Sequence, residues 1–314
     1  MTVGARLSTR VAGLAFQNPI VLASGTAGYG RELADVLDLG QLGGLVTKAV
    51  SIEPRAGNPA PRVAELDGGM INAVGLANPG VAAVRDTHLP WLAAHLPDTR
   101  KLINVVGSAA EDFGAVVEAL EGAGPDAGRA IDGFELNVSC PNVKAGGLEF
   151  GADTASLRSV VTQARRRTQR PLFVKLSPTL ANIGDMARVA VDAGADGITV
   201  VNTIPGLAID VERRRPALGY GTGGVSGVGL LPVGVLAAWR VHRAVPVPVI
   251  GVGGVASATD ALQYIMAGAS LIGVGTAALR DPRAPQRIVR DLDRWCERHT
   301  VRSIADLVGT LELP

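Results

Sequence analysis

The stretch VIGVGGVASATDAL, residues 249–262, contains a complete β-α unit. A short apolar run ends in the pair Gly253-Gly254, and a segment with the spacing of a helix follows. The pattern recurs in LIGVGTAAL, residues 271–279, which turns at Gly275-Thr276. Glycines at such turns let backbone N–H groups approach a phosphate, and the positive end of a helix dipole favours its charge. The stretch therefore predicts parallel β-α architecture and a phosphate site.

Six further apolar runs lie upstream: NPIVLAS (18–24), GGLVTKAV (43–50), KLINVVG (101–107), GFELNVS (133–139), PLFVKLS (171–177) and DGITVVNT (196–203). They show no polar alternation, which is typical of strands buried on both faces of a parallel sheet. Amphipathic segments at 154–168 and 185–195 lie between them. Eight such units predict a single-domain α/β protein, a (β/α)8 TIM barrel spanning 1–314. A doubly wound open sheet is the alternative, because strand order cannot be read from sequence.

Two segments make the chain longer than a minimal barrel. They cover 51–100 and 204–231, and both are rich in glycine and proline. Each follows the carboxyl end of a predicted strand, where barrel enzymes keep their active sites. Loops of this length are usually functional, so we expect both at the site.

Charge and cysteine content restrict the partners. The chain has 30 basic and 29 acidic residues, so no global field attracts it to nucleic acid or anionic membrane. Its amino terminus lacks the apolar core of a signal peptide, and two cysteines do not make a disulfide framework, which together predict a cytoplasmic protein. The uncharged stretch 216–239 has six glycines crowded between residues 219 and 229, which favours a binding loop over a membrane span.

Polar residues gather where the apolar runs end. A strand-end lysine usually snorkels and a single asparagine usually caps a turn, but a closed barrel would bring all of them to one mouth. These residues are Ser24, Lys48, Asn104, Asn137, Cys140, Lys175, Asn202, Thr203, Gly253, Gly254, Gly275 and Thr276. Their convergence predicts a site with two cations, several amides and one thiol.

Cys140 is the candidate reactive group. A thiol has a pKa of about 8.5, so it can act as base or nucleophile near neutral pH. Cys296 fits a small buried apolar residue, no histidine follows a strand, and no metal-binding spacing occurs. GVGGVA matches a dinucleotide fingerprint, but the next strand does not end in the required acidic residue. The pattern favours a mononucleotide-type phosphate and no metal.

Seven motifs carry a resemblance to a known family. The motifs are NVSCPNVKAGGLEFG (137–151), VLASGTAGYG (21–30), GLVTKAVS (44–51), MINAVGLANPG (70–80), VVNTIPGLAIDVE (200–212), GGVSG (223–227) and GVGGV…GTA (251–255 and 275–277). Together they resemble the dihydroorotate dehydrogenases, over about residues 7–295. The resemblance implies one FMN per chain at the carboxyl-terminal mouth of the barrel. It also implies oxidation of (S)-dihydroorotate to orotate in pyrimidine biosynthesis.

The resemblance also assigns roles to residues. Cys140 would remove the C5 proton while hydride leaves C6 for the flavin, and Lys48 would serve both flavin and substrate carboxylate. Substrate contacts would come from Lys48, Asn72, Ala73, Val74, Gly75, Leu76, Asn137, Asn202 and Thr203. Cofactor contacts would come from Ser24, Lys48, Ala49, Asn104, Asn137, Lys175, Val201, Gly227, Gly253, Gly254, Gly275 and Thr276, with Lys175 near the flavin N1–O2 edge.

The same motifs suggest a subclass. A cysteine at 140, where the membrane-bound class has serine, and VKAGGLEFG look like the type B catalytic subunit. This implies a homodimer within a heterotetramer, whose partner subunit carries FAD and a [2Fe-2S] cluster and passes electrons to NAD+. The alternatives are the fumarate-linked type A enzyme, a barrel that reduces uracil or thymine, and a transfer-RNA dihydrouridine synthase, against which the near-zero net charge argues. A flavin-binding scaffold without activity would leave Cys140 unexplained.

Overall fold

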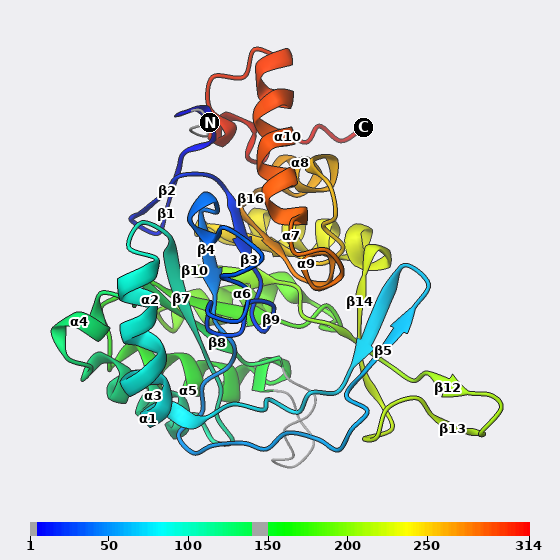
Figure 1. Ribbon diagram of the computed structural model, residues 1–314. Coiled ribbons are helices and arrows are strands. Elements are labelled where there is room, and N and C mark those ends of the chain that lie inside the picture. Colours follow the sequence, from blue (N-terminus) through cyan, green and yellow to red (C-terminus); the bar gives the residue numbers. More distant parts are fainter. Residues whose placement is uncertain (1–4, 140–149) are drawn as a thin grey trace.

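Eight parallel strands close into a barrel. The computed structural model describes residues 5–139 and 150–314. The strands follow one another around the barrel in chain order, and the last pairs with the first (Figure 1). They are β3 (Ile20–Leu22), β4 (Gly44–Val46), β7 (Arg100–Val105), β8 (Gly133–Asn137), β9 (Leu172–Leu176), β10 (Gly197–Val200), β15 (Val249–Val252) and β16 (Ala269–Val274). This confirms the predicted (β/α)8 barrel and excludes the open sheet.

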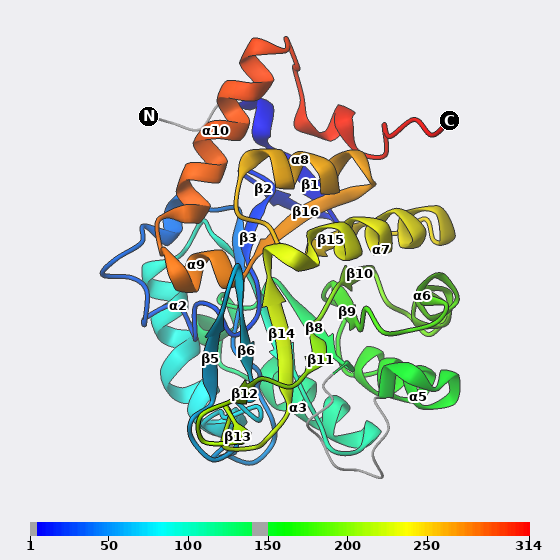
Figure 2. The ribbon, with the colours of Figure 1, turned by 90° about the vertical axis from the view of Figure 1, so that its right-hand side faces the viewer.

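Helices cover the outside of the barrel, and Figure 2 shows α3, α5, α6 and α7 in succession around the strands. The helices are α1 (Gly80–Ala83), α2 (Leu89–His95), α3 (Ala110–Glu121), α4 (Pro125–Gly128), α5 (Thr154–Arg165), α6 (Ile183–Asp192), α7 (Leu231–Ala244), α8 (Ala258–Met266), α9 (Thr276–Arg280) and α10 (Ala284–Arg298). A π-helical segment, Val84–His88, joins α1 to α2. Short 3-10 turns lie at Ala5–Leu7, Leu39–Gln41, Phe150–Ala152, Val228–Leu230 and Ile304–Leu307. None of the helices that the structure describes is both long and apolar enough to cross a membrane.

The quoted stretch 249–262 folds as predicted. Strand β15 ends at Val252, and α8 begins after the cap residue Ser257. Ser257 Oγ accepts a hydrogen bond from Asp260 N, and the Asp260 carboxylate accepts one from Ser257 N, which together form a capping box. This reciprocal cap fixes where the helix starts and therefore how long the glycine turn is.

A hairpin that the sequence analysis missed closes the bottom of the barrel. Strands β1 (Thr9–Val11) and β2 (Leu14–Phe16) pair antiparallel ahead of β3. Val11 and Phe16 are buried in one cluster with inward-facing strand residues such as Leu102 and Phe173. The lower half of the interior is thus packed with apolar side chains, which leaves the opposite end for a site.

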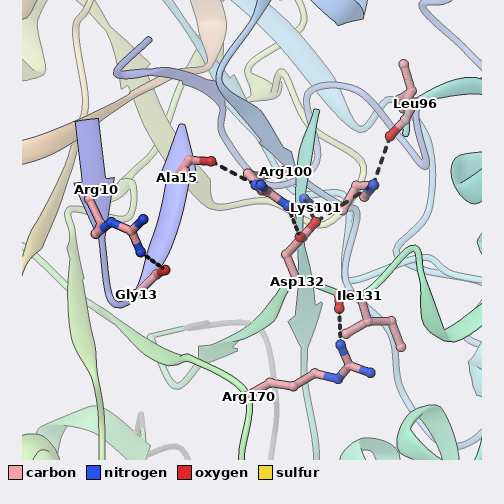
Figure 3. A network of polar contacts seen from close by, with 9 residues as sticks. All are labelled: Arg10, Gly13, Ala15, Leu96, Arg100, Lys101, Ile131, Asp132 and Arg170. Carbon is pink, nitrogen blue, oxygen red and sulfur yellow. Dashed lines mark hydrogen bonds and ion pairs between the residues drawn. The ribbon is translucent and has the colours of Figure 1, made fainter. Parts of the chain in front are cut away.

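Buried and half-buried polar groups tie this hairpin to the barrel (Figure 3). Arg100 Nε donates to Ala15 O over 2.8 Å, and its Nη1 contacts Asp132 Oδ1 at 2.9 Å. Asp132 Oδ2 also accepts a hydrogen bond from Lys101 N. Lys101 Nζ donates to Leu96 O, and burial lowers the pKa of this lysine. The network fixes the start of β7 against the hairpin and the segment after α2.

Parts of the two long segments, which were predicted as loops at the site, form a second sheet. Its strand order is β11 (Ile204–Gly206), β14 (Gly223–Gly227), β6 (Gly69–Asn72) and β5 (Val63–Leu66), all antiparallel. The backbones of β14 and β6 approach each other closely where the two strands pair. A Cβ on Gly227, whose φ is +119°, would lie 2.4 Å from Gly69 Cα. A smaller pair, β12 (Ile209–Asp210) and β13 (Arg215–Pro216), projects away from the barrel (Figure 1).

Tyr264 connects α8 to the end of β15. Its buried Oη lies 2.9 Å from Val252 O and 2.8 Å from Gly253 O. Burial is the main cause of a raised pKa for this phenol, so it remains a donor at neutral pH. The hydroxyl therefore fixes the carbonyl groups at the predicted phosphate turn.

We predict that Tyr264→Phe lowers the free energy of unfolding by about 1–3 kcal/mol, because the carbonyl oxygen of Gly253 loses its donor, whereas Val252 O keeps the one from Val201 N. Urea unfolding of the two proteins measures this change. Tyr220→Phe is the matched control, since Tyr220 is 37% exposed and its loss should change stability by less than about 0.5 kcal/mol. If the two substitutions changed the free energy of unfolding equally, the Tyr264 hydroxyl would not support the turn.

Candidate active site

A cavity of about 760 Å³ opens at the carboxyl ends of the barrel strands. Strand ends of the barrel contribute Lys48, Asn104 and Lys175, and the second sheet forms another wall. Sheet residues that line the cavity are Val63, Glu65, Leu66, Gly69, Met70, Asn72, Gly224, Ser226 and Gly227. The volume lies within the usual range of cofactor and ligand sites, about 300–1,000 Å³.

Two lysines place positive charge in the cavity. Lys175 is 6% exposed, and its Nζ donates to the neutral Ser24 Oγ over 3.1 Å rather than to a carboxylate. Lys48 is half-buried, and its backbone N–H donates to Gly28 O over 2.7 Å. Lysine has three donor hydrogens and no acceptor, so both ammonium groups suit an anionic ligand.

A hydrogen-bond network orients the amide side chains. Asn202 Nδ2 donates to Ser139 Oγ over 2.8 Å and lies 3.3 Å from Asn137 Oδ1. Ser139 Oγ donates to Asn137 Oδ1, and Thr203 N donates to Asn202 Oδ1. The network holds two cavity-lining amides in fixed orientations, as recognition of a heterocycle with N–H and C=O groups requires.

Tight turns from the last two β-α units line another part of the cavity. Gly254 has φ of +75°, and a Cβ there would lie 2.4 Å from Leu231 N, so the turn requires glycine. Gly253, Gly275 and Thr276 line the same part. Thr276 Oγ1 lies 2.8 Å from Ser226 Oγ, which links this turn to the second sheet.

A second buried tyrosine supports the cavity from outside. Tyr29 Oη donates to Ala49 O over 3.0 Å, next to Lys48. Burial and then the charge of Glu32 raise the pKa of Tyr29, so it stays protonated. Like Tyr264, it braces backbone that lines the cavity. Tyr29 lies in the motif VLASGTAGYG, to which the sequence analysis gave no role for a tyrosine, and Tyr264 lies outside every quoted motif.

The structure brings together nearly all the predicted site residues that it describes. Those that line the cavity are Ser24, Lys48, Ala49, Asn72, Val74, Gly75, Leu76, Asn104, Asn137, Lys175, Val201, Asn202, Thr203, Gly227, Gly253, Gly254, Gly275 and Thr276. Ala73 does not, because it is fully buried against Ile71 and Leu218. Cys140 lies outside the described residues.

Sequence reasoning missed several lining residues. Thr26 follows a predicted strand end, and Ser226 lies within the GGVSG motif, so both could have been found. Arg280 and Arg287 come from α9 and α10, where no strand-end pattern marks them. Within residues 5–139 and 150–314, no group of three or more His, Cys, Asp and Glu could hold a metal ion.

Comparison with known proteins gives consistent results. The family described as dihydroorotate dehydrogenase matches residues 6–295. A relative from Pelobacter propionicus named dihydroorotate dehydrogenase B (NAD(+)), catalytic subunit, is 46% identical over 98% of both chains. A Solibacter usitatus relative, provisionally named a dihydroorotate dehydrogenase A (fumarate), is 48% identical over 98% of this chain and 99% of its own.

A solved structure agrees with these relatives. The crystal structure of DHODH in complex with ferulenol from Eimeria tenella superposes with a TM-score of 0.82 at 26% identity, covering 98% of this chain and 89% of the other. The match to the family extends over nearly all of the barrel and includes every motif on which the resemblance rested. This chain therefore belongs to the dihydroorotate dehydrogenase family of oxidoreductases.

Proposed function

We propose that the protein oxidises (S)-dihydroorotate to orotate in pyrimidine biosynthesis and that the cavity at the barrel mouth holds FMN beside the substrate. The observation that carries the proposal is the convergence of Lys48, Lys175 and the amide network on one cavity in a chain of this family. FMN, when bound, supplies the acceptor for the hydride that leaves C6.

The cavity residues fit FMN. Gly253, Gly254 and Gly275 lie where a phosphate can meet backbone N–H groups without a Cβ in the way. Asn104 Oδ1 is buried and has no hydrogen-bond partner among the described residues, which suits a ligand that brings a donor. Lys175 would place a fixed cation beside the flavin and stabilise negative charge on the ring. The rest of the flavin site would be lined by Ser24, Ala49, Val201 and Gly227.

The other half of the cavity suits dihydroorotate. This substrate combines a carboxylate with a cyclic imide, so it needs a cation together with amide partners. Lys48 supplies the cation, and Asn72, Asn137, Asn202 and Thr203 supply donors and acceptors. A pocket for uracil or thymine needs the amides but no cation for a carboxylate, so Lys48 favours dihydroorotate.

Cys140 stays the proposed base that takes the C5 proton. It directly follows Ser139, whose hydroxyl belongs to the amide network around the substrate pocket. This position in the sequence supports the assignment. Positioned proton transfer of this kind contributes about 10² to 10⁴ in rate.

For the electron acceptor we propose NAD+, reached through a partner subunit that carries FAD and a [2Fe-2S] cluster, with two copies of this chain in the complex. Names of relatives from Pelobacter propionicus and Geobacter, which designate NAD(+)-linked catalytic subunits, support this type B assignment. The 48% identity to the Solibacter relative makes the fumarate-linked type A reaction the second candidate.

Anaerobic mixing with L-dihydroorotate tests the proposal. The FMN-loaded protein should lose its visible flavin absorbance within the first turnover, because hydride reaches the bound flavin. L-Aspartate, a carboxylate without the dihydropyrimidine ring, is the control and should leave the spectrum unchanged. A flavin-loaded protein that dihydroorotate does not bleach would remove dihydroorotate oxidation as the function.

The compound that restores the flavin colour then distinguishes the two classes. We expect that neither fumarate nor NAD+ alone reoxidises the isolated chain at the rate of its reduction, and that NAD+ does so once the partner subunit is added. Rapid reoxidation by fumarate without any partner would assign the protein to type A instead.

Cys140→Ala should reduce the rate of flavin reduction by about 10² to 10⁴, with FMN content unchanged, because the base is lost and the cofactor site is kept. Stopped-flow absorbance measures the rate. Cys296→Ala is the matched control: Cys296 is buried on α10, and burial raises its pKa, so its loss should leave the rate within about twofold of the wild type. Unchanged flavin reduction in Cys140→Ala would show that another group takes the proton.

A further inference from the structure

Glu135 is a buried carboxylate beneath the cavity that the proposed mechanism does not use. It lies on β8 inside the barrel, is 1% exposed, and does not line the cavity. Its Oε1 accepts a hydrogen bond of 2.7 Å from Asn104 Nδ2. Asn104, at the end of β7, does line the cavity. Glu135 therefore contacts the site through one amide side chain.

This contact determines which end of the Asn104 amide meets a ligand. Glu135 Oε1 accepts its hydrogen bond from the amide nitrogen and so retains the NH₂ end of the amide. The other end, Oδ1, is buried without a partner among the described residues. The backbone is also held, because Asn104 N donates to Thr47 Oγ1 and Asn104 O accepts from Val50 N. Asn104 thus presents a fixed, unsatisfied acceptor.

Only a ligand with a donor hydrogen satisfies that oxygen. Lys48 and Lys175 offer donors alone, so the nearby cations do not duplicate this acceptor. The oxidised isoalloxazine ring carries one N–H group, at N3. We propose that Glu135 is a positioning residue that fixes Asn104 so that its Oδ1 accepts a hydrogen bond from flavin N3–H. This inference rests on the proposed binding of FMN.

A role for Glu135 as a mere counter-charge is the competing explanation. Lys175 donates to Ser24 rather than to Glu135, which argues against a simple ion pair. The two explanations also differ in what they change. A lost counter-charge alters binding of the whole cofactor, whereas a turned amide alters the environment of N3.

The test uses protein reconstituted with ¹⁵N-labelled FMN. Glu135→Gln removes the charge but keeps a carbonyl acceptor for Asn104 Nδ2, and Glu135→Met removes the acceptor while keeping the side-chain length. We expect the N3 resonance to move in Glu135→Met but not in Glu135→Gln, with N1, N5 and N10 nearly unchanged in both, and the Kd for FMN to rise by up to about tenfold in Glu135→Met. That factor equals about 1.4 kcal/mol, the size of one hydrogen bond.

Glu118→Gln is the matched control, since it makes the same charge change on an exposed helix position and should alter neither readout. If Glu135→Met does not fold, Glu135→Leu, which also lacks an acceptor, takes its place. A variant without the acceptor that binds FMN and is reduced by dihydroorotate with an unshifted N3 resonance overturns the inference and leaves the proposed function intact. A higher Kd without an N3 shift also overturns it, because that pattern indicates the counter-charge role.

Discussion

Closure of the parallel barrel is the constraint on which the site depends. Strand β10 pairs with both β9 and β15, and β16 pairs with β3, so the ladder returns to its start. Parallel strands in a closed ladder end on the same side, which brings groups as far apart in sequence as Ser24 and Thr276 to one cavity. The apolar lower interior and the β1–β2 hairpin make the opposite end unavailable to ligand.

Closure alone does not shape the substrate side. The second sheet pairs residues 69–72 with residues 224–227 and so forms a wall over the mouth. Its side chains alternate: Met70 and Asn72 face the cavity, whereas Ile71 packs away from it with Leu218. Sheet and barrel ends together give a pocket with cations and fixed amides from several separate segments, which suits a small anionic heterocycle.

Much of this could be predicted from residues. The eight apolar runs are the eight barrel strands, because strands buried on both faces leave uninterrupted β-branched runs. Strand-end lysines and asparagines converge for the same topological reason. Ala73 was expected at the ligand, but the two-residue period of the strand places it on the opposite face from Asn72. Because this segment was predicted as a loop, that alternation was not expected.

Other features left no sequence signal. The second sheet joins short strands about 150 residues apart, and such pairing depends on tertiary contacts rather than on local propensity. Tyr29 and Tyr264 donate hydrogen bonds to backbone carbonyl groups that are distant from them in sequence. Glu135 orients Asn104 through a hydrogen bond between neighbouring strands. The role of Cys140 stays a prediction, because that residue lies outside the described part of the chain.

We propose that one cavity holds flavin and pyrimidine side by side. A crystal structure of the FMN-loaded protein with orotate tests it most directly. We expect the orotate carboxylate at Lys48 and the orotate ring among the asparagine side chains. The flavin phosphate should lie at the turns formed by Gly253, Gly254, Gly275 and Thr276. Orotate bound outside this cavity, or flavin phosphate bound away from the glycine turns, would contradict the account.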